Sequence, residues 1–393
     1  MEKQQSRSAR WINRALLVVM VLIFAAGLGK TVFCPDEIDY YENRYANKVA
    51  HLSAASYLDA SFQDSMEDAL ADQVQLATTA KRIYNGAQAY LTRKGSELFL
   101  DEQGRYVKFG DSYTFDDVLV YPTRTLETEQ EKLDAKAENL NAAFAAHPET
   151  EFYLYYIEKD TDLNFETGEK SGLYDYLSSR LDLPSEHMAC FRVDRFDDFR
   201  QNFYRTDHHW NHLGSYLGYT QVMALLGCQD VLEPTEEVDL GYTFSGSKAI
   251  AAGATNVFTE PFSAYRFDFA PETVTVNGQP AADYGAQEAY FAHTPETITY
   301  GMFYGGDEGE VIFDTGTTGR GNLLVLGESY DNAILKLLSE SFDKTYSVDL
   351  RYYEAKMGQS FDFSQYLQEH NISKVLLIGN IDYFVMDEFS IRG

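Results

Sequence analysis

The stretch Leu323-Leu324-Val325-Leu326-Gly327-Glu328-Ser329-Tyr330 decides the fold class of this chain. It opens with an uninterrupted apolar run, which is typical of a strand covered on both faces of a parallel sheet. A helical pattern follows from Asn332 to Phe342. The turn between them therefore lies at the carboxyl end of a buried strand, where doubly wound sheets bind their ligands.

The same alternation of strands and helices recurs on both sides of this stretch. We expect strands at 152–157, 188–193, 347–350 and 375–378, and helices at 127–146, 172–181, 213–226 and 363–370. This order predicts an α/β fold with a parallel sheet flanked by helices. Between residues 232 and 318, short β-type runs alternate with Gly-rich turns, which predicts a β-rich insertion.

Shorter segments give further expectations. Residues 61–91 carry apolar side chains at helical spacing, so we expect one helix there. The runs 97–100 and 106–109 flank Asp101-Glu102-Gln103-Gly104, which is a hairpin signal. Within the insertion, strands are expected at 274–276, 297–300 and 311–313.

The N-terminal segment, residues 1–34, predicts a signal anchor. Basic residues before an apolar run at 15–33 hold the N-terminus in the cytoplasm and send the rest of the chain across. The run is about long enough to span a bilayer at roughly 1.5 Å per residue. A cleavable signal peptide has a similar pattern, but no clean cleavage site is present. We therefore expect a cytoplasmic tail and a single-pass span, followed by one extracytoplasmic domain over 35–393. The basic residues are Lys3, Arg7, Arg10 and Arg14.

Composition limits the partners of this chain of 393 residues. It has 61 acidic and 32 basic residues, and its net charge of -29 repels nucleic acid. A neutral or partly cationic glycan remains compatible with that charge. The chain has no CxxC pair or Cys/His cluster, and we expect neither a metal nor another cofactor. A location outside the cytoplasm would permit a Cys190–Cys228 disulfide, but the sequence does not decide whether it forms. The third cysteine, Cys34, lies just after the predicted membrane span.

Ser329 is the first candidate for catalysis. A serine at a strand-to-helix turn has the backbone N–H groups of the helix N-terminus nearby, and these can stabilise an oxyanion. The alternative is an ordinary helix N-cap serine, which is common at such positions. The motif alone does not separate the two.

The segment Asp207-His208-His209-Trp210, just before the helix expected at 213–226, is the second candidate. A hydrolytic serine needs an imidazole to take its proton and a carboxylate to orient that imidazole. Adjacent histidines point in different directions, so only one is expected to act. Alternatively, Asp207 only caps the helix and the histidines are surface residues. Trp210 beside such a polar cluster, as one of only 2 tryptophans in the chain, argues against that alternative.

A third candidate, Asn380, follows the last expected strand. Its side-chain amide could donate to an oxyanion at the neighbouring strand end, or the residue could simply form a turn. We also place Tyr330, Trp210 and His208 in the pocket around the serine.

The two short motifs make the chain resemble the DHHW protein family, which is similar to the SGNH-hydrolase-like domain of the alginate O-acetyltransferase proteins. The resemblance covers most of the chain after the anchor. It implies an SGNH-hydrolase-like fold in which Asp207 orients, His209 is the base and Ser329 is the nucleophile. His208 falls at the variable position of the related motif. The resemblance also implies transfer of acetyl groups to a bacterial polysaccharide, with a separate membrane-bound acyltransferase as a possible donor.

We therefore expect a membrane-anchored, extracytoplasmic serine O-acyltransferase or esterase that acts on a cell-surface or secreted polysaccharide. Two other functions stay open. Asp207, His208, His209 and His212 are compact enough for a metal-dependent phosphoesterase, although the further Asp-rich motifs of such enzymes are missing. A degenerate site would instead leave a glycan-binding or scaffolding protein, in which some of the 29 Tyr and 26 Phe side chains stack on sugars.

Overall fold

The computed structural model describes residues 7–33, 38–39, 44–73, 77–99, 106–109, 112–255, 257–285, 287–292 and 298–391. The chain divides into two compact units. One consists of Met1–Leu91 with Gly253–Val257, and the other of Thr92–Ala252 with Phe258–Gly393.

The first unit is mainly helical. Its elements are α1 (Arg7–Phe33), the antiparallel pair β1 (Ile38–Asp39) and β2 (Arg44–Tyr45), α2 (Ala54–Leu58), α3 (Ser61–Asp72) and most of α4 (Ala77–Phe99). Among helices in the described ranges, none combines the length and apolar character that a membrane crossing needs. The single helix expected over 61–91 is in fact divided between α3 and α4.

The hairpin expected around residues 101–104 is partly wrong. Residues 97–99 form the end of α4, because an existing helix extends readily through Glu and Leu, which favour helical backbone. Residues 100–105 lie outside the described residues. Tyr106–Phe109 is strand β3, as expected, but it pairs with β4 (Ser112–Phe115), which in turn pairs with β5 (Val118–Val120).

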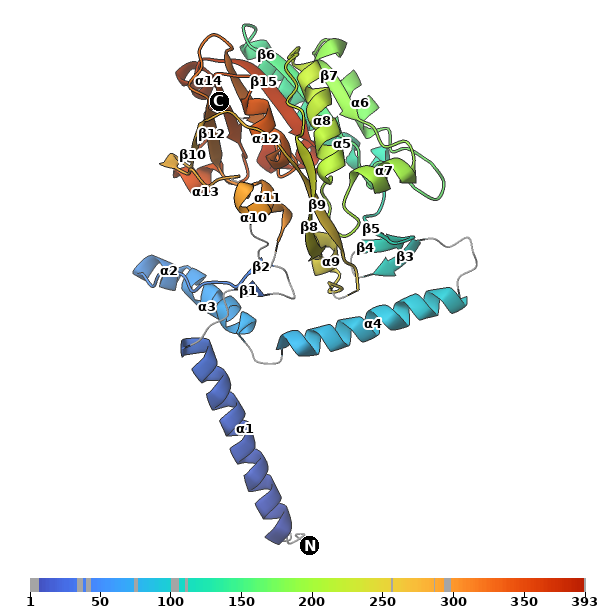
Figure 1. The fold of residues 1–393 in the computed structure, drawn as a ribbon, viewed down its shortest axis with the longest axis vertical. Coiled ribbons are helices and arrows are strands. Elements are labelled where there is room, and N and C mark those ends of the chain that lie inside the picture. The colour runs from blue at the N-terminus through green and yellow to red at the C-terminus, as the bar shows by residue number, and fades with distance from the viewer. Residues whose placement is uncertain are drawn as a thin grey trace. The chain divides into compact units, whose positions relative to one another are not determined.

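The second unit is built on an eight-stranded sheet with the order β11-β10-β12-β14-β13-β15-β6-β7 (Figure 1). Strands β14, β13, β15, β6 and β7 run parallel to one another, whereas β12 pairs antiparallel with β14 and β10, and β10 pairs antiparallel with β11. The α/β class is confirmed, but the sheet is mixed rather than wholly parallel. Its strands are β6 (Glu151–Ile157), β7 (Met188–Phe191), β10 (Thr273–Val276), β11 (Gln279–Pro280), β12 (Glu310–Asp314), β13 (Asn322–Leu326), β14 (Lys344–Val348) and β15 (Ile372–Gly379).

The stretch 232–318 supplies the antiparallel strands. β8 (Glu236–Phe244) and β9 (Glu260–Arg266) form a separate antiparallel pair, while β10, β11 and β12 extend the main sheet at its edge. Composition could not reveal this division, because pairing partners are set by tertiary contacts. The prediction of a strand at 297–300 is wrong for residues 298–300, which the structure describes. Ile298 and Thr299 precede α11 (Tyr300–Tyr304), and the Thr299 side chain caps that helix; Thr297 lies outside the described residues.

Helices cover both faces of the sheet. Leu323 and Val325 of β13 pack in the apolar cluster that contains α8 (His212–Leu225) and α12 (Asn332–Ser339), and Leu324 and Leu326 pack in the opposite cluster. This double burial explains the unbroken apolar run. The opposite cluster includes α5 (Leu126–Ala146), α6 (Leu173–Ser179), α14 (Phe363–Glu369) and α15 (Ile381–Val385). The remaining helices are α7 (Phe196–Asn202), α9 (Ser247–Ala251), α10 (Glu288–Ala292), α13 (Tyr353–Met357) and the 3-10 turns Ser185–His187 and Asp387–Phe389.

Parallel pairing places the carboxyl ends of β6, β13, β14 and β15 at one edge of the sheet. Ser329 and Asn380 follow two neighbouring strands, β13 and β15, at that edge. Cys190 and Cys228 are free thiols, so the disulfide that the sequence permitted is not formed. Cys34 lies outside the described residues.

The packing of Trp210 against α8 gives a stability prediction. A Cβ added at Gly218 would lie 2.5 Å from the buried Trp210 ring. We expect Gly218→Ala to lower the free energy of unfolding by about 1–3 kcal/mol, because a packed core resists added volume. Gly95→Ala is the matched control: its Cβ meets nothing within 4 Å, so it should keep or raise stability by up to about 1 kcal/mol. Urea denaturation measures both, and equal effects would contradict the packing argument.

Candidate active site

Ser329 lies in the turn between β13 and α12. The turn is tight, because a Cβ placed on Gly327 would lie 2.2 Å from Oδ2 of Asp331. The N-cap of α12 is Asp331, so Ser329 is not the ordinary capping serine of the alternative considered above. Ser329 is partly exposed and borders a hollow, which leaves its hydroxyl accessible.

Hydrogen bonds connect Ser329 to the Asp-His-His segment. Nε2 of His209 lies 2.7 Å from Oγ of Ser329, and Nδ1 of His209 lies 2.6 Å from Oδ1 of Asp207. An ionised carboxylate only accepts, so Nδ1–H donates to Asp207, and the neutral ring leaves Nε2 to accept from the serine hydroxyl. The structure thus brings the three residues together in an unbroken chain of hydrogen bonds.

Two aromatic side chains hold the His209 ring and the serine turn. The ring of Tyr300, in α11, stacks on the His209 imidazole with centroids 3.8 Å apart and planes only 2° apart. Trp210 is fully buried, and its Nε1–H donates to the carbonyl of Tyr330 (3.1 Å) and to the Tyr300 hydroxyl (3.2 Å). Trp210 therefore ties the residue after Ser329 to the ring that positions His209.

Asp207 is buried, with both carboxylate oxygens hydrogen-bonded. Oδ1 also accepts from the His209 backbone N–H at 3.0 Å, and Oδ2 accepts from the backbone N–H of Ser247 at 2.6 Å. Burial alone would raise the pKa of Asp207, but the neighbouring His209 and His208 and the hydrogen bonds hold this pKa well below its usual range. The carboxylate therefore stays ionised beside the imidazole.

The turn that meets Asp207 is itself anchored. A Cβ on Gly246 would lie 2.3 Å from that of Asp207, so this close approach requires glycine. Lys248 follows in α9, and its Nζ donates to Oδ2 of Asp160 (2.6 Å) and to the carbonyl of Leu119 (3.0 Å). Both members of this ion pair are fully buried. Removing one partner of such a pair typically costs about 3–5 kcal/mol, so α9 is held firmly against the site.

His208 and Tyr330 lie beside the hydrogen-bonded chain. Nδ1 of His208 is 2.5 Å from Oγ of Ser247, and the Tyr330 hydroxyl donates to the His208 carbonyl. Burial lowers the pKa of His208 well below its usual value. A neutral His208 bonded to Ser247 is placed to support the Asp207 loop, while His209 faces Ser329.

Asn380 comes to the site from the neighbouring strand end, as expected, and it is tied to Glu328. Its backbone N–H (3.0 Å) and its side-chain Nδ2 both donate to Oε1 of Glu328, and its own Oδ1 accepts from the N–H of Asp382. Burial raises the pKa of Glu328. An Nδ2 group carries two N–H donors, so one N–H of Asn380 is available for a ligand oxygen.

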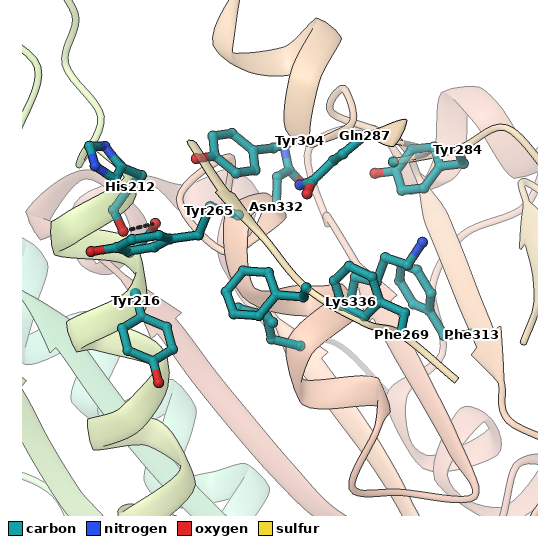
Figure 2. Close-up of a pocket in the computed structure, with 15 residues that line it drawn as sticks. His212, Tyr216, Tyr265, Phe269, Tyr284, Gln287, Tyr304, Phe313, Asn332 and Lys336 are labelled. Carbon is teal, nitrogen blue, oxygen red and sulfur yellow. Dashed lines mark hydrogen bonds between the residues drawn. The ribbon is translucent and has the colours of Figure 1, made fainter. Parts of the chain in front are cut away.

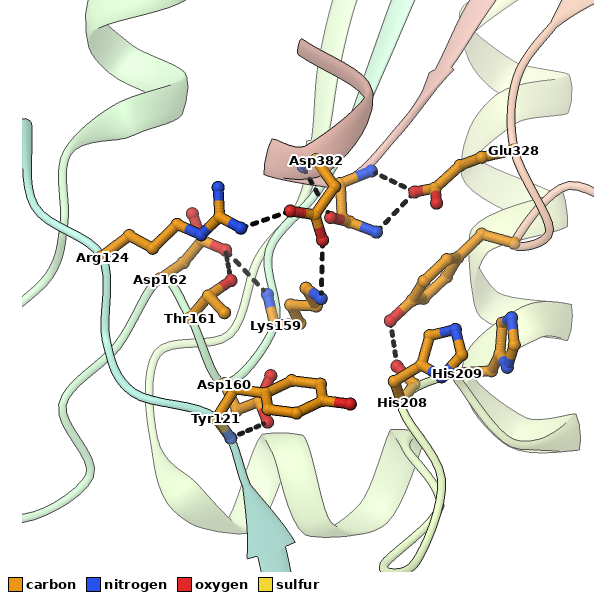
Figure 3. Close-up of polar contacts among 12 residues, drawn as sticks. Tyr121, Arg124, Lys159, Asp160, Thr161, Asp162, His208, His209, Glu328 and Asp382 are labelled. Atoms are coloured by element: carbon orange, nitrogen blue, oxygen red, sulfur yellow. Dashed lines mark hydrogen bonds and ion pairs between the residues drawn. The ribbon is translucent and has the colours of Figure 1, made fainter. Parts of the chain in front are cut away.

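A hollow of about 480 Å³ lies over Ser329. Its lining carries charges of both signs, with Asp307, Glu328 and Asp382 against Arg351. Asp382 is also joined to Arg124 and lies 3.4 Å from Nζ of Lys159 (Figure 3). The lining residues are His208, His209, Tyr300, Gly301, Gly306, Asp307, Glu328, Ser329, Asn332, Arg351, Asn380, Asp382, Met386 and Phe389.

The donor atoms of Asp207, His208 and His209 also lie within 4.8 Å of one another, close enough to consider a metal ion. His212, the other member of the expected cluster, is turned elsewhere, with Nε2 3.2 Å from Oε1 of Glu237. The atoms of Asp207 and His209 that could bind a metal already take part in hydrogen bonds. Nδ1 of His209 bonds to Oδ1 of Asp207, and Nε2 of His209 bonds to Oγ of Ser329. A cation could bind there only by breaking that chain, so the geometry favours the hydrogen-bonded arrangement.

Sequence reasoning missed several residues around the site. The sequence pattern predicts a strand at Tyr300 rather than a helix. It gives no functional signal for Gly246, Ser247 and Lys248, which lie within the expected insertion. Ser245-Gly246-Ser247 is a turn signal before a short helix, but nothing in it indicates which loop it faces. The alternative that the histidines lie on the surface is wrong for His209, which is buried, and α8 is capped by Asn211 rather than by Asp207.

Comparison with known proteins supports the expected resemblance. The DHHW protein family model matches residues 161–348, a range that holds the Asp207–Trp210 motif and Ser329. A search of curated proteins finds no match. The resemblance to the DHHW family is thereby confirmed.

Solved structures resemble this chain in fold. Bacillus cereus PatB1 with a sulfonyl adduct is 22% identical, with a TM-score of 0.55, over 72% of this chain and 97% of that chain. A DHHW family protein from Eubacterium siraeum DSM 15702 is 16% identical, with a TM-score of 0.52, over 72% and 95%. The O-acetyltransferase domain of Pseudomonas putida AlgJ gives 13% identity and a TM-score of 0.39, over 69% and 91%.

The lowered pKa of Asp207 predicts a pH-dependent loss of stability on replacement by Asn. A carboxyl group whose folded pKa lies below its unfolded value of about 3.9 stabilises the fold above that pH and loses the contribution as the pH falls. The stability difference between wild type and Asp207→Asn should be largest near neutral pH and should shrink from about pH 4 downwards. Urea denaturation across a pH series measures it.

Glu186→Gln, at an exposed carboxylate, serves as the control and should show little difference from wild type at any pH. A penalty for Asp207→Asn that grows as the pH falls would contradict an ionised Asp207 in the folded chain.

Proposed function

We propose that this chain, which resembles the DHHW protein family, is a serine O-acyltransferase or esterase that acts on a polysaccharide, with Ser329 as nucleophile, His209 as base and Asp207 as orienting carboxylate. One observation carries the proposal: the continuous hydrogen bonds from Ser329 through His209 to Asp207 at the mouth of a hollow. Such a chain lets a neutral imidazole take the serine proton while a fixed carboxylate favours the resulting imidazolium.

The first half of the reaction forms an acyl-enzyme. Oγ of Ser329 attacks the carbonyl carbon of an ester as Nε2 of His209 takes the hydroxyl proton. The tetrahedral oxyanion is held by the backbone N–H of Ser329 and the free N–H of Asn380. When it collapses, the ester C–O bond breaks, the acyl group stays on Ser329, and His209 returns its proton to the leaving alcohol.

The second half releases the acyl group. A sugar hydroxyl or a water molecule gives its proton to Nε2 of His209 and attacks the acyl carbonyl carbon. The acyl–Oγ bond then breaks, and His209 returns the proton to Oγ, which restores the Ser329 hydroxyl. Asp207 stays ionised throughout, since its low pKa keeps the proton on His209. A sugar hydroxyl as acceptor gives transfer, and water gives hydrolysis.

An acetyl group and a polysaccharide are the substrates that the family resemblance suggests. The charge of -29 fits a neutral or partly cationic glycan better than an anionic one. We further propose that residues 1–34 anchor the chain in the membrane, with the enzyme outside the cytoplasm and a separate membrane-bound acyltransferase as donor. The basic residues before the apolar run support that orientation.

Replacement of the nucleophile tests the proposal. Ser329→Ala should abolish labelling by a fluorophosphonate or sulfonyl fluoride probe and lower the hydrolysis of p-nitrophenyl acetate by on the order of 10⁴–10⁶-fold. Ser185→Ala, at an exposed serine, is the control and should label like wild type. Labelling that persists in Ser329→Ala, or activity that is lost on treatment with EDTA and restored by manganese or zinc, would favour the metal-dependent phosphoesterase instead. Absence of any labelling or turnover in folded wild type would favour a binding protein.

The oxyanion role of Asn380 makes a separate prediction. Asn380→Ala removes a donor that acts mainly in the transition state, so kcat should fall by about 10²–10³-fold while KM changes little. The measurement is steady-state hydrolysis of p-nitrophenyl acetate, with labelling at Ser329 as a check that the nucleophile is intact. A rise in KM with kcat unchanged would assign Asn380 to substrate binding only.

A further inference from the structure

A second hollow, of about 640 Å³, lies next to α12 and away from Ser329. Partly exposed aromatic rings form much of its wall: Phe267, Phe269, Tyr284 and Phe291. These rings also pack against the hydrophobic core, and the parts of them that face the hollow are suited to stacking on another flat apolar surface.

The same hollow contains a buried acid and a base. The Glu272 side chain is only 6% exposed, and its Oε2 accepts from Oγ of Ser339 at 3.0 Å. Its Oε1 has no hydrogen-bond partner among the residues that the structure describes, and lies 3.7 Å from Nζ of Lys336. Nζ of Lys336 in turn lies 4.6 Å from the centre of the Phe269 ring. A small shift of Lys336 would expose an unsatisfied acceptor beside an aromatic face.

A small cavity shares lining residues with both this aromatic hollow and the hollow over Ser329. It is only about 20 Å³ in volume, and it shares Phe269, Tyr284 and Lys336 with the aromatic hollow and Asn332 with the Ser329 hollow. Figure 2 shows Lys336 beside Phe269, and Asn332 beside Tyr304. The Tyr284 hydroxyl donates to the carbonyl of Gly306, at 3.2 Å, and Gly306 lines the Ser329 hollow. Tyr284 of the aromatic hollow is thus hydrogen-bonded to a residue that lines the Ser329 hollow.

The charges in the aromatic hollow limit its ligand. Its lining includes the acidic side chains of Asp268, Glu272 and Glu288 but, among the described lining residues, Lys336 as the only basic one. Lys336 lies 3.7 Å from Glu272, and Arg266, outside the lining, lies 3.5 Å from Glu288. The remaining excess of acid is therefore small but does not favour a chain of uronic acids. A neutral sugar is compatible with these charges, since its hydroxyls can donate to a carboxylate and its C–H faces can lie on aromatic rings.

We propose that the aromatic hollow is a subsite for a neutral sugar unit of the acceptor glycan, beyond the unit that is acylated at Ser329. The inference rests on the proposed function for the claim that the substrate is a glycan. Phe269 would stack on the sugar ring and Glu272 would accept from its hydroxyls. Binding of the polymer at this subsite would hold the acceptor in place without any contact to the reacting atoms.

Binding of neutral oligosaccharides to the full chain tests the subsite. Cellohexaose, chitohexaose and mannohexaose are each titrated by isothermal titration calorimetry, with oligogalacturonate as the anionic comparison. We expect at least one neutral hexaose to bind and oligogalacturonate not to bind. Phe269→Ala and Glu272→Gln should each weaken that binding about fivefold or more, the effect of losing one aromatic or hydrogen-bonding contact.

Tyr174→Ala is the matched control, because Tyr174 is also a partly exposed ring with a cation above it, here Arg192 at 4.6 Å. It should leave hexaose binding unchanged. Hydrolysis of p-nitrophenyl acetate, a substrate too small to reach the subsite, should be unchanged in Phe269→Ala and Glu272→Gln, which also confirms that both variants fold.

The two proposals can fail separately. Wild type that turns over the small ester but binds no neutral hexaose, or binds it equally well in both variants, overturns the subsite alone. Hexaose binding that depends on Phe269 and Glu272, in a protein without esterase activity or probe labelling, supports the subsite and overturns the enzymatic function.

Discussion

The buried carboxylate of Asp207 is the interaction on which the rest of the site depends. A buried charge is tolerated only when it is paired and hydrogen-bonded, and this one accepts from the His209 ring, from the His209 backbone and from Ser247. These donors come from two loops that are distant in sequence. Satisfying one charge therefore closes the loop before α8 against the start of α9, and in doing so aims the imidazole at Ser329.

The sheet supplies the other half of the arrangement. Parallel pairing of β13 with β15 puts the turns that follow them side by side, so Ser329 and Asn380 meet without any long-range loop. Glu328 joins the two turns through the backbone and side chain of Asn380. The serine is thus carried by rigid elements, whereas its base comes from a loop that needs external supports, namely Tyr300 and α9.

The sequence was sufficient for the parts that local pattern controls. The unbroken apolar run of β13 predicts a doubly covered strand, and the turn after it follows from that; the strands β6 and β15 are also predicted from their sequence. Pairing of Ser329 with His209 came only with the family resemblance, because no local rule relates residues so far apart. Periodicity in the sequence does not predict the antiparallel edge formed by β10 and β12, because strand pairing there depends on tertiary contacts. The same holds for the position of Tyr300. The prediction of a hairpin strand at 97–100 is wrong for residues 97–99, because helix α4 continues through this short apolar run.

The stacking of Tyr300 on His209 has a consequence for the order of events in the proposed reaction. Parallel rings at 3.8 Å and the hydrogen bond from Nδ1 to Asp207 hold the imidazole in one orientation, so the same nitrogen takes the proton in each half of the proposed reaction. The incoming acceptor must then stand where the first alcohol stood. The two reacting alcohols therefore occupy this position in turn, as in a double displacement through the acyl-enzyme.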